Sequence, residues 1–159
     1  MPYDRDAYLA LFPKVEQATK EFFDLGGPNS AAAREMLADA WIRHDHLADT
    51  QNAHEITYWS VFLLSQIARE DPASGWLLIT DLLPRELPPR ALYALAGKLQ
   101  DLIACHGSVV LPYIESQAPT DPRLRDLLGG VWRDEELECF WPRIAPLRGE
   151  PWRWDPHDS

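Results

Sequence analysis

The chain has 159 residues, 25 of them acidic and 15 basic, and its formal net charge of −10 argues against nucleic acids and anionic membranes, since both attract surfaces rich in Lys and Arg. Its 46% apolar residues and seven tryptophans are enough to bury the core of a single compact domain. The acidic surface predicts a basic protein or a cationic ligand as partner, unless the charge serves solubility alone.

The cysteines and the N-terminal stretch indicate the compartment. Cys105 and Cys139 are isolated and far apart in sequence, so they form neither a disulfide framework nor a metal-binding pair. The opening "MPYDRDAYLALF" lacks a basic region followed by an apolar one, and no stretch approaches the roughly 20 apolar residues of a membrane span. We therefore expect reduced cysteines and a cytoplasmic protein.

Helical patterns fill the first half of the chain. A segment from about residue 4 to 24 is broken or restarted at Pro13, and Ser30 caps a second helix after the turn "LGGPNS". One face of that helix carries residues at three- and four-residue spacing: Ala33, Leu37, Ala40, Trp41, His44 and Leu47. A third helix, from about 53 to 69, contains "YWSVFLLSQI", which is apolar on nearly every side apart from Ser60 and Ser65. We expect this helix to be central and the most buried.

Proline and glycine punctuate the second half. Asp71 caps a helix over about 73–83 and precedes Pro72, which loses no hydrogen bond at a first helical position. The next helix runs from about 88 to 106 and closes on Gly107 as a left-handed residue. A helix from Ser108 to about 117 follows, then an Asp-Pro start and Gly stop in "TDPRLRDLLGG", and an acidic-headed last helix in "RDEELECFWPRIAPL".

No segment shows the sustained alternation of a strand, so the predicted fold is all-α. We expect a compact stack of antiparallel helical hairpins with about 7–8 helices. The apolar pattern of Leu63 and Ile67 recurs about 36 residues later at Leu99 and Ile103, a spacing in the range of HEAT-like repeats. Residues 1–148 are predicted to form one helical domain, and residues 149–159 an irregular tail rich in Trp and Pro.

The stretch "HDHLADTQNAHEITYW", residues 44–59, holds three of the five histidines. On a helix, His44 and His46 point about 200° apart and cannot bind one metal. His54 begins "HEITY", with Tyr58 where a zinc His-Glu-x-x-His motif needs its second ligand. We interpret the stretch as two helix ends and their turn, with "NAHE" as a helix start and with no metal or cofactor. The alternative is a small metal-dependent hydrolase that uses the three histidines.

Groups for other catalysis are not predicted. We interpret the two Gly-Gly pairs, Gly26-Gly27 and Gly129-Gly130, as helix ends and not as a phosphate-binding loop. Cys105 and His106 are neighbours on a helix and diverge by about 100°, and a helix C-terminus disfavours a thiolate. We therefore predict no catalytic residue.

Acidic residues and tryptophans combine near the C-terminus. Four acids at positions 134–138 complement the positive end of the predicted last helix, and Trp132 and Trp141 bracket them. Carboxylates beside exposed aromatic rings are also what a surface for a basic partner requires. The predicted partner-binding residues are Asp134, Glu135, Glu138 and Trp132, with Asp45, Asp49 and His46 as a second exposed patch.

The stretches "ALAGKLQDLIACHG" and "DPRLRDLLGGVW" resemble a bacterial family of small proteins that is catalogued only as a domain of unknown function, over about Trp41 to Trp141. Its pattern has an Ala-Gly-x-Leu-acid/amide-Asp-Leu core, then His-Gly and a later Gly-Val-Trp. Lys98 and Gln100 stand where that pattern has Pro and Glu. The resemblance implies one helical domain and transfers no activity to Asp101, His106 or Trp132.

In size, acidity and helical character the chain is also similar to immunity proteins of bacterial toxin systems, which occlude a toxin without chemistry of their own. The leading hypothesis is a non-enzymatic, immunity or antitoxin-like inhibitor of a toxin that acts in the cytosol. The metal-dependent hydrolase and a helical scaffold or adaptor are the alternatives, and the oligomeric state stays open.

Overall fold

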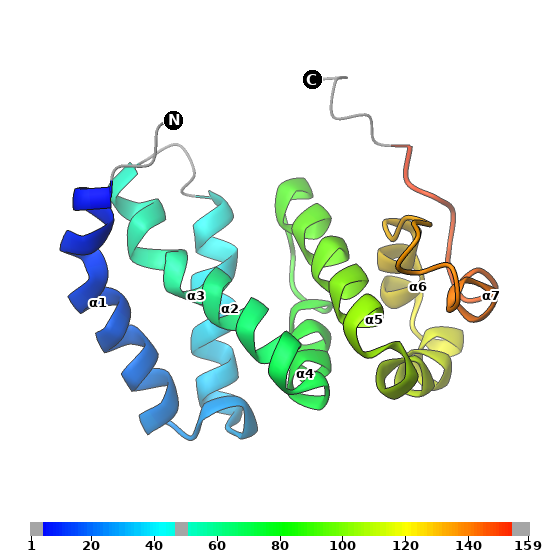
Figure 1. The fold of residues 1–159 in the computed structure, drawn as a ribbon, viewed down its shortest axis with the longest axis horizontal. Helices are drawn as coiled ribbons and strands as arrows, with labels where there is room; N and C mark the ends of the chain where they lie inside the picture. The colour runs from blue at the N-terminus through cyan, green and yellow to red at the C-terminus, as the bar shows by residue number, and fades with distance from the viewer. Residues whose placement is uncertain (1–4, 47–50, 154–159) are drawn as a thin grey trace. The chain divides into compact units, whose positions relative to one another are not determined.

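The computed structural model describes the backbone of residues 5–46 and 51–153, and the side chains of residues 14–44 and 57–153. Every regular element in these ranges is helical (Figure 1), which confirms the predicted all-α class. The chain divides into two compact units, the N-terminal unit (Met1–Ala91) and the C-terminal unit (Leu92–Ser159). That residues 1–148 behave as one domain stays a prediction.

The N-terminal unit consists of α1 (Arg5–Asp24), the 3-10 helix η1 (Gly27–Asn29), α2 (Ala31–His46), α3 (Gln51–Glu70) and α4 (Pro72–Leu82). Helix α3 contacts α1, α2 and α4, so it is central to this unit as predicted (Figure 1). The largest side chains of the core come from all four helices: Phe22, Leu37, Trp41, Trp59, Leu64 and Trp76.

Two local predictions in this unit are confirmed by hydrogen bonds. Ser30 caps α2, because its Oγ accepts from the Ala33 N–H at 3.3 Å. Asp71 caps α4, where its carboxylate accepts from the Ser74 N–H at 3.2 Å and from the Ser74 hydroxyl at 2.6 Å. Gly26 and Gly27, with φ of 110° and 62°, make the left-handed turn between α1 and α2.

Two predictions about helices α1 and α3 are wrong. Helix α1 runs unbroken across Pro13, because a proline removes one hydrogen bond and bends a helix without having to end it. Helix α3 is not buried on every side: Ser60 is fully buried and donates to the Thr57 carbonyl at 2.6 Å, whereas Phe62 is 58% exposed. A hydroxyl that bonds to its own helix backbone can face the core, and this leaves an aromatic ring facing outward.

The C-terminal unit consists of most of α5 (Pro89–Gln117), the 3-10 helix η2 (Ala118–Thr120), α6 (Pro122–Gly129) and the single turn α7 (Trp141–Ile144). Its core is lined by fully buried side chains from α5, α6 and the segment that follows: Leu99, Leu111, Ile114, Leu124, Leu127, Val131 and Leu137. Asp121 caps α6 as predicted and accepts from the N–H groups of Arg123 and Leu124.

The helix break at residues 106–107 is present, but the predicted left-handed Gly107 is wrong. Helix α5 is kinked at His106, with φ of −139° and ψ of 30°, and Gly107 does not have a positive φ. The glycine is needed for space, because a Cβ at position 107 would lie 2.6 Å from two ring carbons of Phe140. Without a side chain at position 107, α5 comes into direct contact with Phe140, in the segment before α7.

The predicted acidic-headed helix over 133–147 is also wrong. Residues 135–140 form successive turns, and only Trp141–Ile144 are α-helical. Pro142 has no N–H to donate back to Glu138, and the N–H groups of Phe140 and Trp141 donate three residues back, to the carbonyls of Leu137 and Glu138 at 2.9 and 3.4 Å. Asp134 accepts the Leu137 N–H at 2.9 Å as a helix cap does, but the chain after it forms tight turns in place of an α-helix.

The stretch from Gly149 to Arg153 is irregular, as predicted, and it packs against α6. The Gly149 N–H donates to the Arg125 carbonyl at 2.8 Å, and the Trp152 N–H donates to the Gly129 carbonyl at 2.9 Å. A Cβ at Gly129 would lie 2.3 Å from the Glu150 carbonyl oxygen, so these glycines again provide space. In the described ranges, no helix has the length and apolar content needed to cross a membrane.

The cap of α4 gives a pH-dependent stability prediction. The two hydrogen bonds from Ser74 hold the pKa of the Asp71 carboxyl below its usual range, so the cap stabilises the fold above the pKa of the unfolded chain, about 4, and this contribution is lost as pH falls through the lower folded pKa. Asp71→Ala should lower the free energy of unfolding by about 1 kcal/mol at pH 7 and by much less near pH 2. Urea unfolding at both pH values measures this. Asp71→Asn is the control, since it keeps an acceptor that does not titrate; equal stability of Asp71→Ala and the natural chain at pH 7 would contradict the cap.

Substitutions at two glycines of α5 distinguish a steric effect from an effect of backbone flexibility. Gly107→Ala should destabilise the fold by about 1–3 kcal/mol, because the new methyl group overlaps the Phe140 ring. Gly97→Ala should instead stabilise it by about 0.5–1 kcal/mol, because a Cβ there meets nothing within 4 Å. Thermal unfolding of both variants tests the pair, and the double variant Gly107→Ala with Phe140→Ala should recover part of the loss. A shift of the same sign for both glycines would reject the steric explanation.

Candidate functional site

The histidine stretch is only partly described. His44 is half-buried, its Nδ1 lies 3.0 Å from the Thr57 hydroxyl, and its ring lies 6.0 Å from that of Tyr58. His44 therefore joins α2 to α3. The side chains of Asp45, His46 and His54 and the whole of Asp49 lie outside the described residues, so the second predicted patch and the hydrolase alternative stay predictions. Helix α3 begins at Gln51, so the predicted helix start at Asn52 is one position inside the helix.

The predicted C-terminal surface is a turn held in place by one amide side chain. Residues 131–140 follow α6 and form the acidic turn. The Trp132 N–H donates to Gln100 Oε1 at 3.0 Å, and Gln100 Nε2 donates to the Asp134 carboxylate at 2.7 Å. The second Asp134 oxygen accepts the Leu137 N–H at 2.9 Å. Gln100 on α5 therefore fixes both ends of the Trp132–Asp134 segment.

The acids of this turn differ in how much charge they offer to a partner. Arg133 donates two hydrogen bonds to Glu138, at 2.8 and 2.6 Å, and these lower the pKa of the Glu138 carboxyl. Asp134 is already bonded to Gln100 and to the backbone. Glu135 and Glu136 are exposed, and no ion pair to either is found within residues 57–153. Of the three predicted acids, Glu138 is thus the one paired with a cation, and within residues 57–153 Glu135 is the one whose carboxylate accepts no hydrogen bond.

The tryptophans divide into one exposed ring and several packed ones. Trp132 is 49% exposed, more than any other tryptophan of the described part of the chain. Trp141, which was predicted to bracket the acids, has the Arg148 guanidinium 5.0 Å above its ring, and Trp152 packs over Gly130. The structure therefore keeps Trp132 as a surface residue and assigns the other two to packing.

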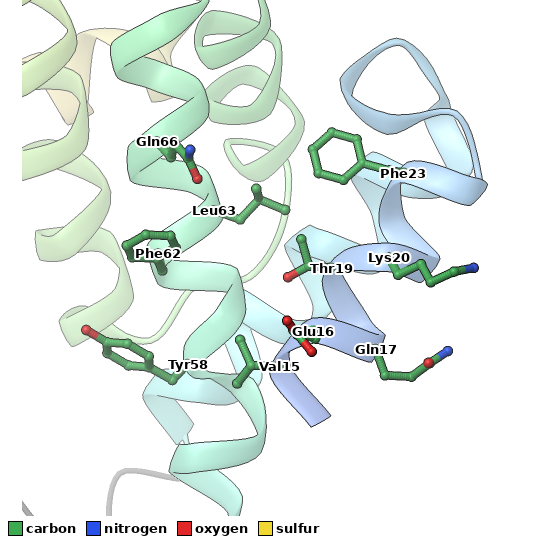
Figure 2. Close-up of a pocket in the computed structure, with 10 residues that line it drawn as sticks. All are labelled: Val15, Glu16, Gln17, Thr19, Lys20, Phe23, Tyr58, Phe62, Leu63 and Gln66. Atoms are coloured by element: carbon green, nitrogen blue, oxygen red, sulfur yellow. The ribbon is translucent and has the colours of Figure 1, made fainter. Parts of the chain in front are cut away.

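Sequence reasoning missed two residues of this site and one further cavity. In the sequence, Gln100 stands out only as a departure from the family pattern, and Arg133 lies five positions from Glu138, which is not a helical spacing. The cavity, the α1–α3 groove, measures about 650 Å³ and lies between residues 15–23 of α1 and 58–66 of α3 (Figure 2). Its signal was the apolar run of α3, which was assigned wholly to the core.

Residues 46–151 match the family described as "Family of unknown function (DUF6869)". This confirms the resemblance read from the motifs around positions 94–107 and 121–132 and covers about the same part of the chain. No curated protein and no solved structure matches the chain.

The role of Gln100 can be tested by one change of atom. In Gln100→Glu, the new carboxylate should still accept from the Trp132 N–H. It can no longer donate to the Asp134 carboxylate, and the two negative charges repel each other. We expect the free energy of unfolding at pH 7 to fall by about 1 kcal/mol more than in the control Gln66→Glu, which adds the same charge to an exposed position of α3. The difference in stability between Gln100→Glu and Gln66→Glu should disappear below about pH 4, where a protonated carboxyl can donate a hydrogen bond again. Urea unfolding of both variants at pH 7 and pH 3 measures this difference in stability. Equal losses in the two variants would contradict the role of Gln100 in holding Trp132 and Asp134.

Proposed function

Since the chain belongs to this family of unknown function, we propose its role from its own surface: a non-enzymatic binding protein that covers a basic partner protein with the acidic turn. The form of this role that fits the charge is an immunity-like inhibitor, which occludes the active site of a toxin. The observation that carries the proposal is the half-exposed Trp132 on a backbone fixed by Gln100.

Preorganisation supports a binding role for the turn. Ordering a loop on association costs free energy, and here Gln100, Asp134 and the buried Leu137 already hold the backbone. An exposed tryptophan on such a rigid support is the side chain that most often contributes strongly at protein interfaces. The large ring would fill a pocket of the partner at little further entropic cost.

Charge supports a basic partner. Glu135 and Glu136 extend into solvent beside Trp132, and the whole chain carries a net charge of −10. Carboxylates around an aromatic anchor raise the rate of encounter with a cationic surface and discriminate against acidic ones. The Arg133–Glu138 pair contributes no net charge, so the steering falls to the other carboxylates of the turn, of which Glu135 and Glu136 are exposed.

The test first identifies the partner and then measures the contributions of Trp132 and of Glu135 separately. Protein purified from its native cells should retain one basic protein at low salt, and adding the chain should block that protein's activity. Trp132→Ala should weaken the measured affinity about 30-fold or more, mainly through faster dissociation. Glu135→Lys should slow association and reduce its salt dependence.

Glu86→Lys is the matched control, since it reverses an exposed acid of the N-terminal unit and changes the net charge by the same amount. It should leave the affinity within about threefold. Equal effects of Glu135→Lys and Glu86→Lys would show that only net charge matters and would overturn the assignment of the acidic turn. A partner that binds Trp132→Ala and the natural chain equally would overturn it as well.

A further inference from the structure

The α1–α3 groove carries three exposed aromatic rings in one place. Phe23 is 54% exposed, Tyr58 40% and Phe62 58%, and all three line the groove of about 650 Å³. Single exposed apolar residues are normal on a protein surface, but several around one hollow mark a binding site. Figure 2 shows Val15 and Thr19 pointing from α1 toward α3, and Leu63 pointing from α3 toward α1.

The core beneath the groove is complete without these rings. Phe22 is fully buried and Leu63 is 4% exposed, so α1 and α3 already pack against the rest of the N-terminal unit below the groove. Phe23 and Phe62 are each more than half exposed, so they bury less of their rings against the unit than Phe22 and Leu63 do. Their exposure has a cost in water that a bound apolar partner would remove.

Two charged residues, Glu16 and Lys20, line this groove. Figure 2 shows the Glu16 carboxylate between the two helices, whereas Lys20 points away from α3. The Lys20 ammonium lies 2.5 Å from Asp24 and is thereby neutralised. Within residues 14–44 and 57–153, no cation forms an ion pair with Glu16. Of the two charged residues that line the groove, Lys20 is paired with Asp24, and Glu16 is left to attract a cation beside the aromatic rings.

The length of the groove limits what it can hold. Its lining spans residues 15–23 on α1 and 58–66 on α3, about 12 Å along each helix or slightly more than two turns. A groove between two helices is the usual seat for a third, amphipathic helix, which inserts apolar side chains spaced three or four residues apart. Two such side chains fit this length.

We propose that the α1–α3 groove binds a short amphipathic helix of a partner protein. Two apolar side chains of the partner helix insert between Phe23 and Phe62, and a Lys or Arg beside them on that helix pairs with Glu16. A second copy of the chain is the poorer occupant, because two copies of a protein of net charge −10 repel each other. The groove belongs to the N-terminal unit and the acidic turn to the C-terminal one, so the two proposals are tested separately.

A displayed library of helix-forming 16-residue peptides, selected on the full chain, tests the groove. The selected peptides should share two large apolar residues three or four positions apart with a neighbouring Lys or Arg. Phe62→Ser and Glu16→Lys should each weaken binding of the best peptide at least tenfold in a fluorescence titration. Leu77→Ser is the control, since Leu77 is an exposed apolar residue of α4 outside the groove, and it should leave binding unchanged.

Charge exchange makes the test specific. A peptide whose Lys is replaced by Glu should bind the natural chain at least tenfold more weakly and should bind Glu16→Lys with most of the lost affinity restored. Melting temperatures of all variants should stay within a few degrees of the natural chain, and Phe23→Ser repeats the test from the other wall of the groove. The acidic-turn variant Trp132→Ala should bind the peptide normally.

Three results would overturn the proposal. The first is a selection that enriches no peptide over the same selection on Phe62→Ser. The second is an enriched peptide that binds Phe62→Ser and Phe23→Ser as tightly as the natural chain. The third is a concentration-dependent mass of twice 18.2 kDa that Phe62→Ser returns to 18.2 kDa, since a second copy would then be the occupant.

Discussion

The backbone of residues 131–153 has to satisfy its polar groups with a single turn of helix, and this constraint shapes the C-terminal unit. Side chains therefore do what helical hydrogen bonds do elsewhere. Gln100 accepts the Trp132 N–H, Asp134 accepts the Leu137 N–H, and Arg148 donates to the carbonyls of Gly129 and Val131 at 3.1 Å. Because these partners come from α5 and from the segment itself, the turn has a fixed conformation although it lacks regular structure. A fixed, irregular surface segment is suited to recognition.

The two candidate surfaces differ in chemistry and agree in the charge they select. The acidic turn carries the exposed Trp132 ring and the exposed carboxylates of Glu135 and Glu136, and the groove carries exposed aromatic rings with Glu16 in its lining. Coulomb attraction at the exposed turn is screened by salt and acts chiefly on the rate of encounter. The groove relies on buried apolar area, which salt does not screen.

Helix starts and stops could be predicted from neighbouring residues in the sequence, but contacts between distant segments could not. The Asp-Pro pairs at 71 and 121 predicted helix starts correctly, because a cap and the missing N–H of proline act within four residues. The glycine breaks were placed correctly at 107 and 129, but their reason is close approach by Phe140 and Glu150, which no local pattern encodes. The same limit explains Phe62: an apolar run predicts that a helix is buried, but not which of its sides lacks a neighbour.

The residue at position 100 shows how a family pattern and a structure have to be read together. The pattern of the resemblance has an acid or an amide there, with Glu as the expected residue, and an acid on its own would suggest a group for acid or base chemistry. In this chain the position must accept from the Trp132 N–H and donate to Asp134 at the same time. An amide does both, whereas an ionised carboxylate can only accept. Gln100 is therefore a positioning residue, and its chemistry is matched to Asp134. A Glu at 100 would fit the same turn where residue 134 offers a donor, so the two positions are expected to change as a pair.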